Sequence, residues 1–272
     1  MKRTRTNIIS VLAAAVTVCS MCIPVGASAV YGENLLTNPD AANGFKGWKG
    51  TGKAWSAAES YNDIEAYDGK FFMPKKVKLK KGESTSIYQD IPVKDYVGKE
   101  AQLRGYIHTA DGKEGDHLSL NVEFLDKSGK SVGSNGTGSG LANSWRTCAV
   151  YTEIPKNAVT ARISLDVRYD AGDYADGCFD DIFFAIDGVK RSDLFPEDTQ
   201  KRRSYFIKKG TVINVSDVFP DAGKGKVKWS TSDKSIVSVD SSGNITAKEY
   251  GTAVVTAKCG KEKVKIKVDV DW

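Results

Sequence analysis

Strict alternation of apolar and polar residues constrains the fold of this 272-residue chain more than any other feature. The alternation runs through residues 101–109, 118–124 and 161–169. A repeat of two places all apolar side chains of a strand on one face, which predicts antiparallel sheets packed on a core. Turn-forming residues, including the glycine-rich stretch 133–140, separate these segments, and no long amphipathic helix is predicted. The expected fold class is all-β, built from β-sandwiches.

Residues 1–29 have the three parts of a secretory signal peptide. Lys2, Arg3 and Arg5 precede an apolar run, and the small-residue sequence 27–29 (Ala-Ser-Ala) follows it. An uncleaved membrane anchor is the alternative, but polar residues interrupt the run. We therefore expect a secreted protein, possible attachment to the cell surface, and no membrane span after cleavage.

The net charge of +5 is unevenly distributed along the chain. Residues 30–190 carry 20 Lys and Arg against 23 Asp and Glu, whereas residues 191–272 carry 16 against 11. We expect alternate charged residues of the last strand to face water, namely Lys263, Lys265, Lys267 and Asp269. No aromatic residues alternate with these lysines, so the stacking platform typical of nucleic-acid binding is missing, and nucleic acid is not predicted as a partner.

The sequence lacks the motifs of the common enzyme classes. It has 2 His, no Ser-His-Asp order, no phosphate-binding glycine motif and no Cys/His metal spacing. Glu123 and Asp166 are carboxylates of the type that glycosidases use, but nothing in the sequence places them at the required separation. We therefore predict that the protein is not an enzyme.

Residues 189–204 divide the mature chain into two parts. This segment is charged, contains Pro196 and lacks alternation, so we predict a linker. It separates an N-terminal unit, residues 30–188, from a smaller strand-rich unit, residues 205–272.

Several short motifs in the C-terminal unit form a family pattern. They are Lys209-Gly210, Trp229–Asp233, Val237–Asp240, Gly243, Ile245–Ala247 and Gly251–Ala257. With them, residues 205–272 resemble the group 2 bacterial immunoglobulin-like domain. The resemblance implies a small non-catalytic sandwich that acts as a spacer or as part of an adhesin. Physically, we expect Trp229 to fill its core, and Gly243 and Gly251 to supply turns.

The N-terminal unit has a second series of motifs. They are Asn34–Asp40 with Gly47-Trp48, Tyr67–Lys70, Tyr88–Ile91, Trp145–Thr147 and Phe179–Phe184. Their order and spacing resemble the galactose-binding-like jelly roll, in particular carbohydrate-binding modules of the family 4, 9 and 22 type. The resemblance implies a jelly-roll β-sandwich that binds a polysaccharide. The same fold also serves protein recognition, so the fold alone does not settle the ligand.

The resemblance also bears on a structural Ca²⁺. In the family, an acid after the first turn and an acid of the last strand help to hold this ion. This chain has Ala41 and Ala42 after the turn, but Asp40 and Asp181 remain. A structural Ca²⁺ held by Asp40 and Asp181 therefore stays open, because Ca²⁺ requires several oxygen ligands.

The polar faces of three predicted strands supply the candidate binding residues. They are Arg104, Tyr106 and His108, then Asn121 and Glu123, then Asp166 and Arg168. On a shared concave face, their guanidinium, carboxylate, amide and aromatic groups can contact sugar hydroxyls. The alternative is a solvated sheet face held by cross-strand ion pairs.

Aromatic residues outside these strands are further candidates. Trp55, Tyr61 and Tyr67 lie in a polar, loop-rich stretch, and Tyr174 adjoins the strand that ends near residue 169. We predict that these four side chains border the site, with a structural role as the alternative. Trp48 and Trp145 are instead expected in the core.

Three cysteines remain after residue 29, namely Cys148, Cys178 and Cys259, so at least one is unpaired. Cys148 and Cys178 can form a disulfide in an oxidising compartment, or both can be buried as small apolar side chains.

Together these features predict a secreted, non-catalytic glycan-binding protein with a C-terminal spacer. The alternative is a bacterial cell-surface adhesion or protein-interaction module that binds no sugar. The mechanism expected for the first hypothesis combines aromatic stacking with polar contacts to hydroxyl groups.

The signal peptide makes a direct prediction. Intact-mass measurement of the exported protein should show a chain that starts at Val30, because cleavage follows Ala29. A chain that starts at Met1 would contradict this prediction.

Overall fold

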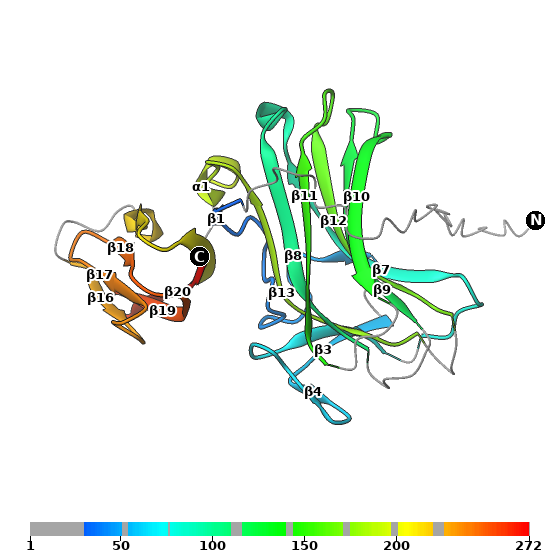
Figure 1. The fold of residues 1–272 in the computed structure, drawn as a ribbon, viewed down its shortest axis with the longest axis horizontal. Coiled ribbons are helices and arrows are strands. Elements are labelled where there is room, and N and C mark those ends of the chain that lie inside the picture. The colour runs from blue at the N-terminus through cyan, green and yellow to red at the C-terminus, as the bar shows by residue number, and fades with distance from the viewer. Residues whose placement is uncertain are drawn as a thin grey trace, which may run out of the picture.

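The computed structural model describes residues 30–50, 54–75, 77–109, 116–139, 144–170, 175–196, 201–219 and 226–271. Over these residues the chain is almost entirely β-structure, which confirms the predicted fold class (Figure 1). The predicted signal peptide, residues 1–29, and Tyr174 lie outside the described residues. Among the helices that are described, none has the length and apolar character needed to cross a membrane.

The N-terminal unit is a sandwich of two five-stranded sheets. We call the sheet with the order β10-β9-β12-β7-β2 the distal sheet, because it lies on the side away from the C-terminal unit (Figure 1). Its strands are β2 (Lys49–Gly50), β7 (Ser84–Pro92), β9 (His117–Leu125), β10 (Ser131–Ser139) and β12 (Thr160–Arg168).

The other sheet, with the order β11-β8-β13-β6-β3, is called the proximal sheet. Its strands are β3 (Trp55–Ala58), β6 (Phe71–Pro74), β8 (Glu100–His108), β11 (Arg146–Glu153) and β13 (Cys178–Ile186). A separate hairpin is formed by β4 (Ser60–Tyr61) and β5 (Ile64–Glu65), and a 3-10 turn spans Lys94–Tyr96.

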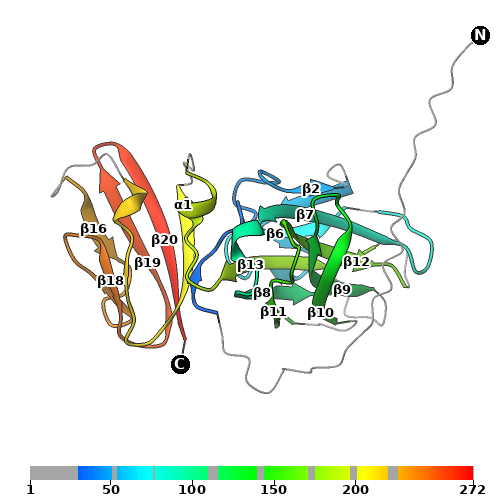
Figure 2. The same ribbon diagram turned by 90° about the horizontal axis from the view of Figure 1, so that it is seen from above.

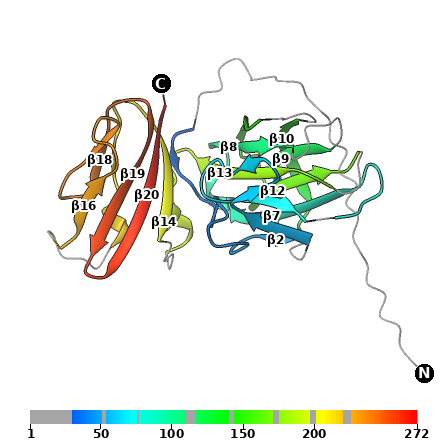
Figure 3. The same cartoon turned by 90° about the horizontal axis from the view of Figure 1, so that it is seen from below.

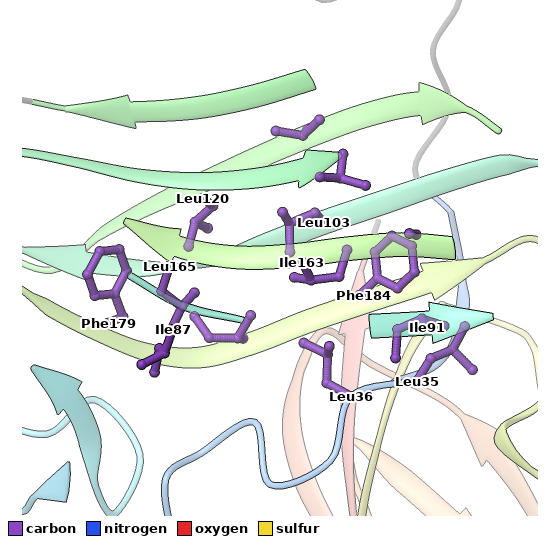
Figure 4. Close-up of a cluster of buried hydrophobic side chains, with 14 of the residues drawn as sticks. Leu35, Leu36, Ile87, Ile91, Leu103, Leu120, Ile163, Leu165, Phe179 and Phe184 are labelled. Carbon is purple, nitrogen blue, oxygen red and sulfur yellow. The ribbon is translucent and has the colours of Figure 1, made fainter. Parts of the chain in front are cut away.

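The core of the sandwich lies between the two sheets (Figure 4). Leu103 of β8, Leu120 of β9 and Leu165 of β12 are fully buried there, together with Phe179 and Phe184 of β13. The alternating strands therefore turn their apolar faces inward, as the period of two predicts. Burial of these aliphatic and aromatic side chains is the main stabilising contribution in such a sandwich.

The glycine-rich stretch 133–140 is a correction to the sequence analysis. Most of it lies in strand β10, which pairs with β9 from Ser131 to Ser139, and is not a turn. A Cβ atom on Gly136 would come within 2.0 Å of Asn121 Oδ1, so the glycine leaves room for a side chain of the neighbouring strand. The glycine content predicted a turn, because composition alone does not show that a neighbouring side chain approaches this strand closely.

Two tryptophans differ from the predictions. Trp48 is buried, as expected, but Trp55, predicted to border a binding site, is also buried, and its Nε1 donates to Thr85 Oγ1 at 2.9 Å. Trp145, predicted for the core, is only partly buried. Pairing of β3 with β6 draws Trp55 inward, and this long-range contact has no signal in the local sequence.

The C-terminal unit consists of two further sheets, with the orders β1-β14-β20-β19-β16 and β15-β18-β17. Trp229 packs against its core beside Gly243, whose φ is +79°. The strands are β14 (Arg202–Lys208), β15 (Val212–Asn214), β16 (Lys228–Thr231), β17 (Val237–Val239), β18 (Asn244–Ala247), β19 (Gly251–Cys259) and β20 (Glu262–Asp271). A 3-10 turn spans Ser216–Val218.

The predicted linker, residues 189–204, contains regular structure. It holds helix α1 (Arg191–Leu194) and the first residues of β14. Strand β1 (Gly32–Glu33), from the start of the N-terminal unit, pairs antiparallel with β14. The C-terminal sheet is therefore completed by residues that precede the jelly roll, and the two units lie side by side with β20 near their junction (Figure 2).

Side chains at this junction form a mixed apolar and charged contact. Phe206 of β14 packs against Val30, Phe183 and Ala185 of the N-terminal unit. Lys267 of β20, predicted to face water, instead places its Nζ 2.9 Å from Asp181 Oδ2. Although burial alone lowers the pKa of Lys267, the nearby carboxylates raise it above the usual value.

The most deeply buried ion pair of the junction joins Arg203 to Glu33. Arg203 Nη1 lies 3.3 Å from Glu33 Oε1 and 2.8 Å from Asp217 Oδ2. The side chains of Glu33 and Arg203 are 1% and 7% exposed. Burial raises the pKa of Glu33, while Arg203 and the backbone N–H of Arg191 counteract that effect. Loss of one member would leave a buried charge without its partner.

This arrangement predicts a large stability difference between two substitutions. Arg203→Met should lower the free energy of unfolding by about 3–5 kcal/mol, because it leaves the Glu33 carboxylate buried and unpaired. Lys201→Met, which removes an exposed ion pair with Glu262, should cost less than about 1 kcal/mol. Urea unfolding of the full chain measures both values. Equal effects of the two substitutions would contradict the buried ion pair.

Candidate functional site

The residues predicted to share one cleft lie on opposite faces of the sandwich. Arg104, Tyr106 and His108 belong to β8 of the proximal sheet. The other four, Asn121, Glu123, Asp166 and Arg168, belong to the distal sheet. Both groups alternate with core residues and so point outward, away from each other. The prediction of a single cleft was wrong, because alternation shows which residues share a strand face but not which strands share a sheet.

The outer face of the distal sheet, which we call the distal face, contains a rigid cluster that the sequence analysis missed. Arg162 forms a bidentate ion pair with Asp90. Its Nε donates to Asp90 Oδ1 at 2.8 Å, and its Nη2 donates to Asp90 Oδ2 at 3.2 Å. The Arg162 guanidinium also lies 4.2 Å from the centre of the Tyr88 ring. These residues belong to β7 and β12, and alternation in residues 84–92 was the signal that could have identified Tyr88 and Asp90.

Electrostatics keep this cluster charged. Burial pushes the pKa of Asp90 up, but hydrogen bonds and charge from Arg162 and Lys49 outweigh that effect and lower it. The hydrogen bond to Asp90 raises the pKa of Arg162. A guanidinium held by a carboxylate and stacked on a ring has its orientation fixed before any ligand binds.

A second polar group lies beside the first. Asn121 Nδ2 donates to Asp166 Oδ2 at 2.8 Å, and the Ser164 hydroxyl donates to the same carboxylate. Burial raises the pKa of Asp166, while these hydrogen bonds counteract the rise. Arg168, at the end of β12, is paired with Asp170 at 2.8 Å. Asn121 and Asp166 are therefore joined by a hydrogen bond on this face, whereas Arg168 pairs separately with Asp170.

The two carboxylates considered as glycosidase groups are not neighbours along the sheet. Glu123 pairs with Arg162 in the strand register, and Asp166 lies four positions further along β12. At a rise of about 3.3 Å per residue, that offset is about 13 Å along the strand. That offset separates the two backbone positions, and the negative charge of Glu123 still contributes to the raised pKa of Asp166.

On the proximal sheet, the C-terminal unit covers Arg104. Its guanidinium lies 5.0 Å from the ring centre of Phe183 and 3.9 Å from that of Phe206, and Nη2 is 3.1 Å from Asp269 Oδ2. Arg104 is therefore a junction contact, not an accessible ligand-binding residue. The same contact corrects the prediction that Asp269 faces water.

Tyr106 and Tyr67 form a stacked pair on the proximal sheet. Their ring centres are 3.7 Å apart, and the Tyr67 hydroxyl donates to the Tyr106 hydroxyl at 2.9 Å. This hydrogen bond, with burial, raises the pKa of Tyr67 to about 12. His108 and Tyr67 line a shallow pocket with Trp145, while Tyr61 is 36% exposed on the β4–β5 hairpin.

The two acids predicted to hold Ca²⁺ are paired with cations of the C-terminal unit. Asp40 lies 3.0 Å from Arg202 Nη1, and Asp181 lies 2.9 Å from Lys267 Nζ. Over the described ranges, no group of three or more His, Cys, Asp or Glu residues could hold a metal ion. A donor set whose carboxylates already face ammonium and guanidinium groups does not fit Ca²⁺.

The cysteines that follow the predicted signal peptide are free thiols. Cys148 of β11 is partly buried and Cys178 of β13 is buried, and β8 lies between their strands. Burial raises the pKa of both thiols. Of the two alternatives, the structure therefore shows small partly or fully buried side chains without a bridge.

Comparison with known proteins identifies the C-terminal region. Residues 199–268 match the family model of the bacterial Ig-like domain (group 2), which confirms the resemblance found in the sequence. No curated protein matches the chain significantly.

Solved structures with a related fold include several carbohydrate-binding modules. TmCBM61 in complex with β-1,4-galactotriose is 19% identical, with a TM-score of 0.42, and the match covers 57% of this chain and 100% of that module. The CBM22-1-GH10 modules of Clostridium thermocellum xylanase 10B with xylohexaose are 18% identical, with a TM-score of 0.40 and coverages of 60% and 29%. The enzymatically active domain of bacteriophage CBA120 tailspike protein 4 is also 18% identical, with a TM-score of 0.43, and this chain spans only 21% of it while 56% of this chain is matched.

The buried acid Asp180 predicts a pH dependence of stability. Burial raises its pKa to about 8, although the backbone N–H groups of Asp68 and Asp181 stabilise the charged form. The folded carboxyl thus binds its proton more tightly than the unfolded one, so stability falls as the pH rises from about 4 to about 8.

Replacement of this carboxyl should weaken that dependence. Unfolding of Asp180→Asn in urea, measured from pH 4 to 8, should show a smaller fall in unfolding free energy than the parent chain. Asp126→Asn is the control, because hydrogen bonds lower the pKa of Asp126 at an exposed turn. An unchanged slope in Asp180→Asn would refute the raised pKa.

Proposed function

We propose that the protein binds a glycan without catalysis, on the distal face. The observation that carries this proposal is the cluster of Arg162, Asp90 and Tyr88, which is fixed by its own contacts and remains partly exposed. Figure 3 shows the C-terminal unit beside β13 and β8, so that unit lies on the opposite side of the sandwich from this cluster.

The polar groups on this face are suited to sugar hydroxyls. A hydroxyl both donates and accepts hydrogen bonds, and the face offers guanidinium donors from Arg162, the carboxylates of Asp90 and Glu123, and the amide of Asn121. Because Asp90 and Tyr88 already orient the guanidinium, little side-chain entropy is lost when a ligand binds. We expect weak reversible binding, with dissociation constants in the range of about 1 mM to 1 μM.

The C-terminal unit acts in this proposal as a spacer of fixed orientation. The pairing of β1 with β14 and the buried Arg203–Glu33 contact restrain it against the jelly roll. Together with the signal peptide predicted over residues 1–29, a spacer of this kind fits a secreted or cell-surface glycan-binding protein.

One variant tests the proposed face directly. Arg162→Ala should weaken glycan binding by about tenfold or more, because it removes the oriented guanidinium. The glycan is first identified on an array that includes xylan and β-1,4-galactan, and affinities are then measured by calorimetry. Lys127→Ala, at an exposed turn, is the matched control and should bind like the parent chain.

Thermal unfolding establishes that both variants are folded before binding is compared. If the parent chain binds no glycan on the array, the proposal is overturned, and a protein-interaction module becomes the better account. Equal affinity of folded Arg162→Ala and the parent chain would place the ligand elsewhere.

A further inference from the structure

A shallow pocket lies on the other side of the sandwich from the distal face, at the hairpin of β4 and β5. The pocket is open to solvent, and its volume is about 460 Å³. Its lining includes three aromatic residues, Tyr67, His108 and Trp145, and two acids, Asp63 and Glu65. None of these residues belongs to the distal face.

The aromatic side of this pocket is held in place by its neighbours. Trp145 Nε1 donates to the Glu65 carbonyl at 2.9 Å, and the indole packs edge-on against Phe71 and His108, with ring centres 5.9 and 5.5 Å away. His108 Nδ1 donates to the Thr109 carbonyl at 2.7 Å, which leaves Nε2 as the remaining polar atom of the ring. The rings are therefore positioned without a ligand.

The C-terminal unit supports the opposite wall. Tyr67 is 49% exposed and stacks on Tyr106, and the next residue, Asp68, accepts a hydrogen bond from Lys267 Nζ at 3.1 Å. The backbone N–H of Asp68 also donates to Asp180 at 2.9 Å. The wall that carries Tyr67 is thus connected to β13 and to the C-terminal unit.

The charge of the pocket limits its ligands. Asp63 and Glu65 contribute two carboxylates, and no Lys or Arg is among the described lining residues. Neither carboxylate forms an ion pair with another described side chain. An anionic ligand would be repelled, whereas a cation would gain from the carboxylates and from the faces of Tyr67 and Trp145.

We propose that this pocket is a second binding site, for an amino sugar with a protonated amine, such as a glucosamine unit. The ring of the sugar packs on the exposed aromatic surface, and its ammonium group faces Asp63 and Glu65. The hydroxyl groups of the sugar can form a hydrogen bond with His108 Nε2. The site is independent of the glycan-binding function proposed for the distal face.

Calorimetry with the full mature chain and a glucosamine tetramer tests the site. The measurement is made at about pH 6, where an amine is protonated. We expect the tetramer to bind about tenfold or more tightly than the N-acetylglucosamine tetramer, which has the same rings without the positive charge. This comparison uses the unmodified chain and so does not depend on the folding of any variant.

Paired variants then locate the ligand. Asp63→Asn combined with Glu65→Gln should weaken binding of the glucosamine tetramer by about tenfold, because the shape is kept and the charge is lost. Glu59→Gln is the control, since Glu59 is a neighbouring acid that pairs with Lys70 and does not line the pocket. Arg162→Ala should leave this binding unchanged, which separates the pocket from the distal face.

Several outcomes would overturn the proposal. These are no binding of the glucosamine tetramer, equal binding of the N-acetylated tetramer, or an unchanged affinity in the folded double variant. Loss of binding in Arg162→Ala would also overturn it, because the ligand would then occupy the distal face.

Discussion

The pairing of β1 with β14 is the interaction on which the arrangement of this molecule depends. Gly32 pairs with Phe206 and Glu33 with Tyr205, so residues before the jelly roll become part of the C-terminal sheet. This connection brings the C-terminal unit against the proximal sheet, where Phe206 and Asp269 enclose Arg104. One outer face of the sandwich is therefore partly covered, and the polar surface of the other sheet is left uncovered by the C-terminal unit.

Charge complementarity makes this contact specific. Acids of the N-terminal unit face bases of the C-terminal unit, as Asp181 faces Lys267 and Asp40 faces Arg202. The uneven charge of the sequence thus has a structural use, since part of the basic excess of the C-terminal unit is paired at the junction. Buried ion pairs add little stability relative to apolar contacts, but a mismatched orientation would leave charges unpaired. The pairs consequently define how the units dock.

The sequence predicted the secondary structure better than the assembly. Period-two alternation identified β8, β9 and β12, because burial of one strand face directly determines the residue pattern. The assignment of strands to sheets depends on pairing between distant residues, so His108 and Asn121 were wrongly expected on one face. The difference between the expected and observed burial of Trp55 and Trp145 has the same origin, since burial of Trp55 accompanies the pairing of β3 with β6, which the residues next to it in the sequence do not indicate. The sequence analysis did not select Arg162, Asp90 and Tyr88 as candidate binding residues. They form a site only through their contacts with one another across β7 and β12, which are distant in the sequence.

The central claim is that the distal face is the glycan-binding surface. Amide hydrogen exchange of the full chain, with and without a glycan selected on the array, tests it most directly. The account predicts slower exchange in β7 and β12, residues 84–92 and 160–168, when the glycan is bound. Protection confined to the proximal strands β8 and β11 would contradict the account.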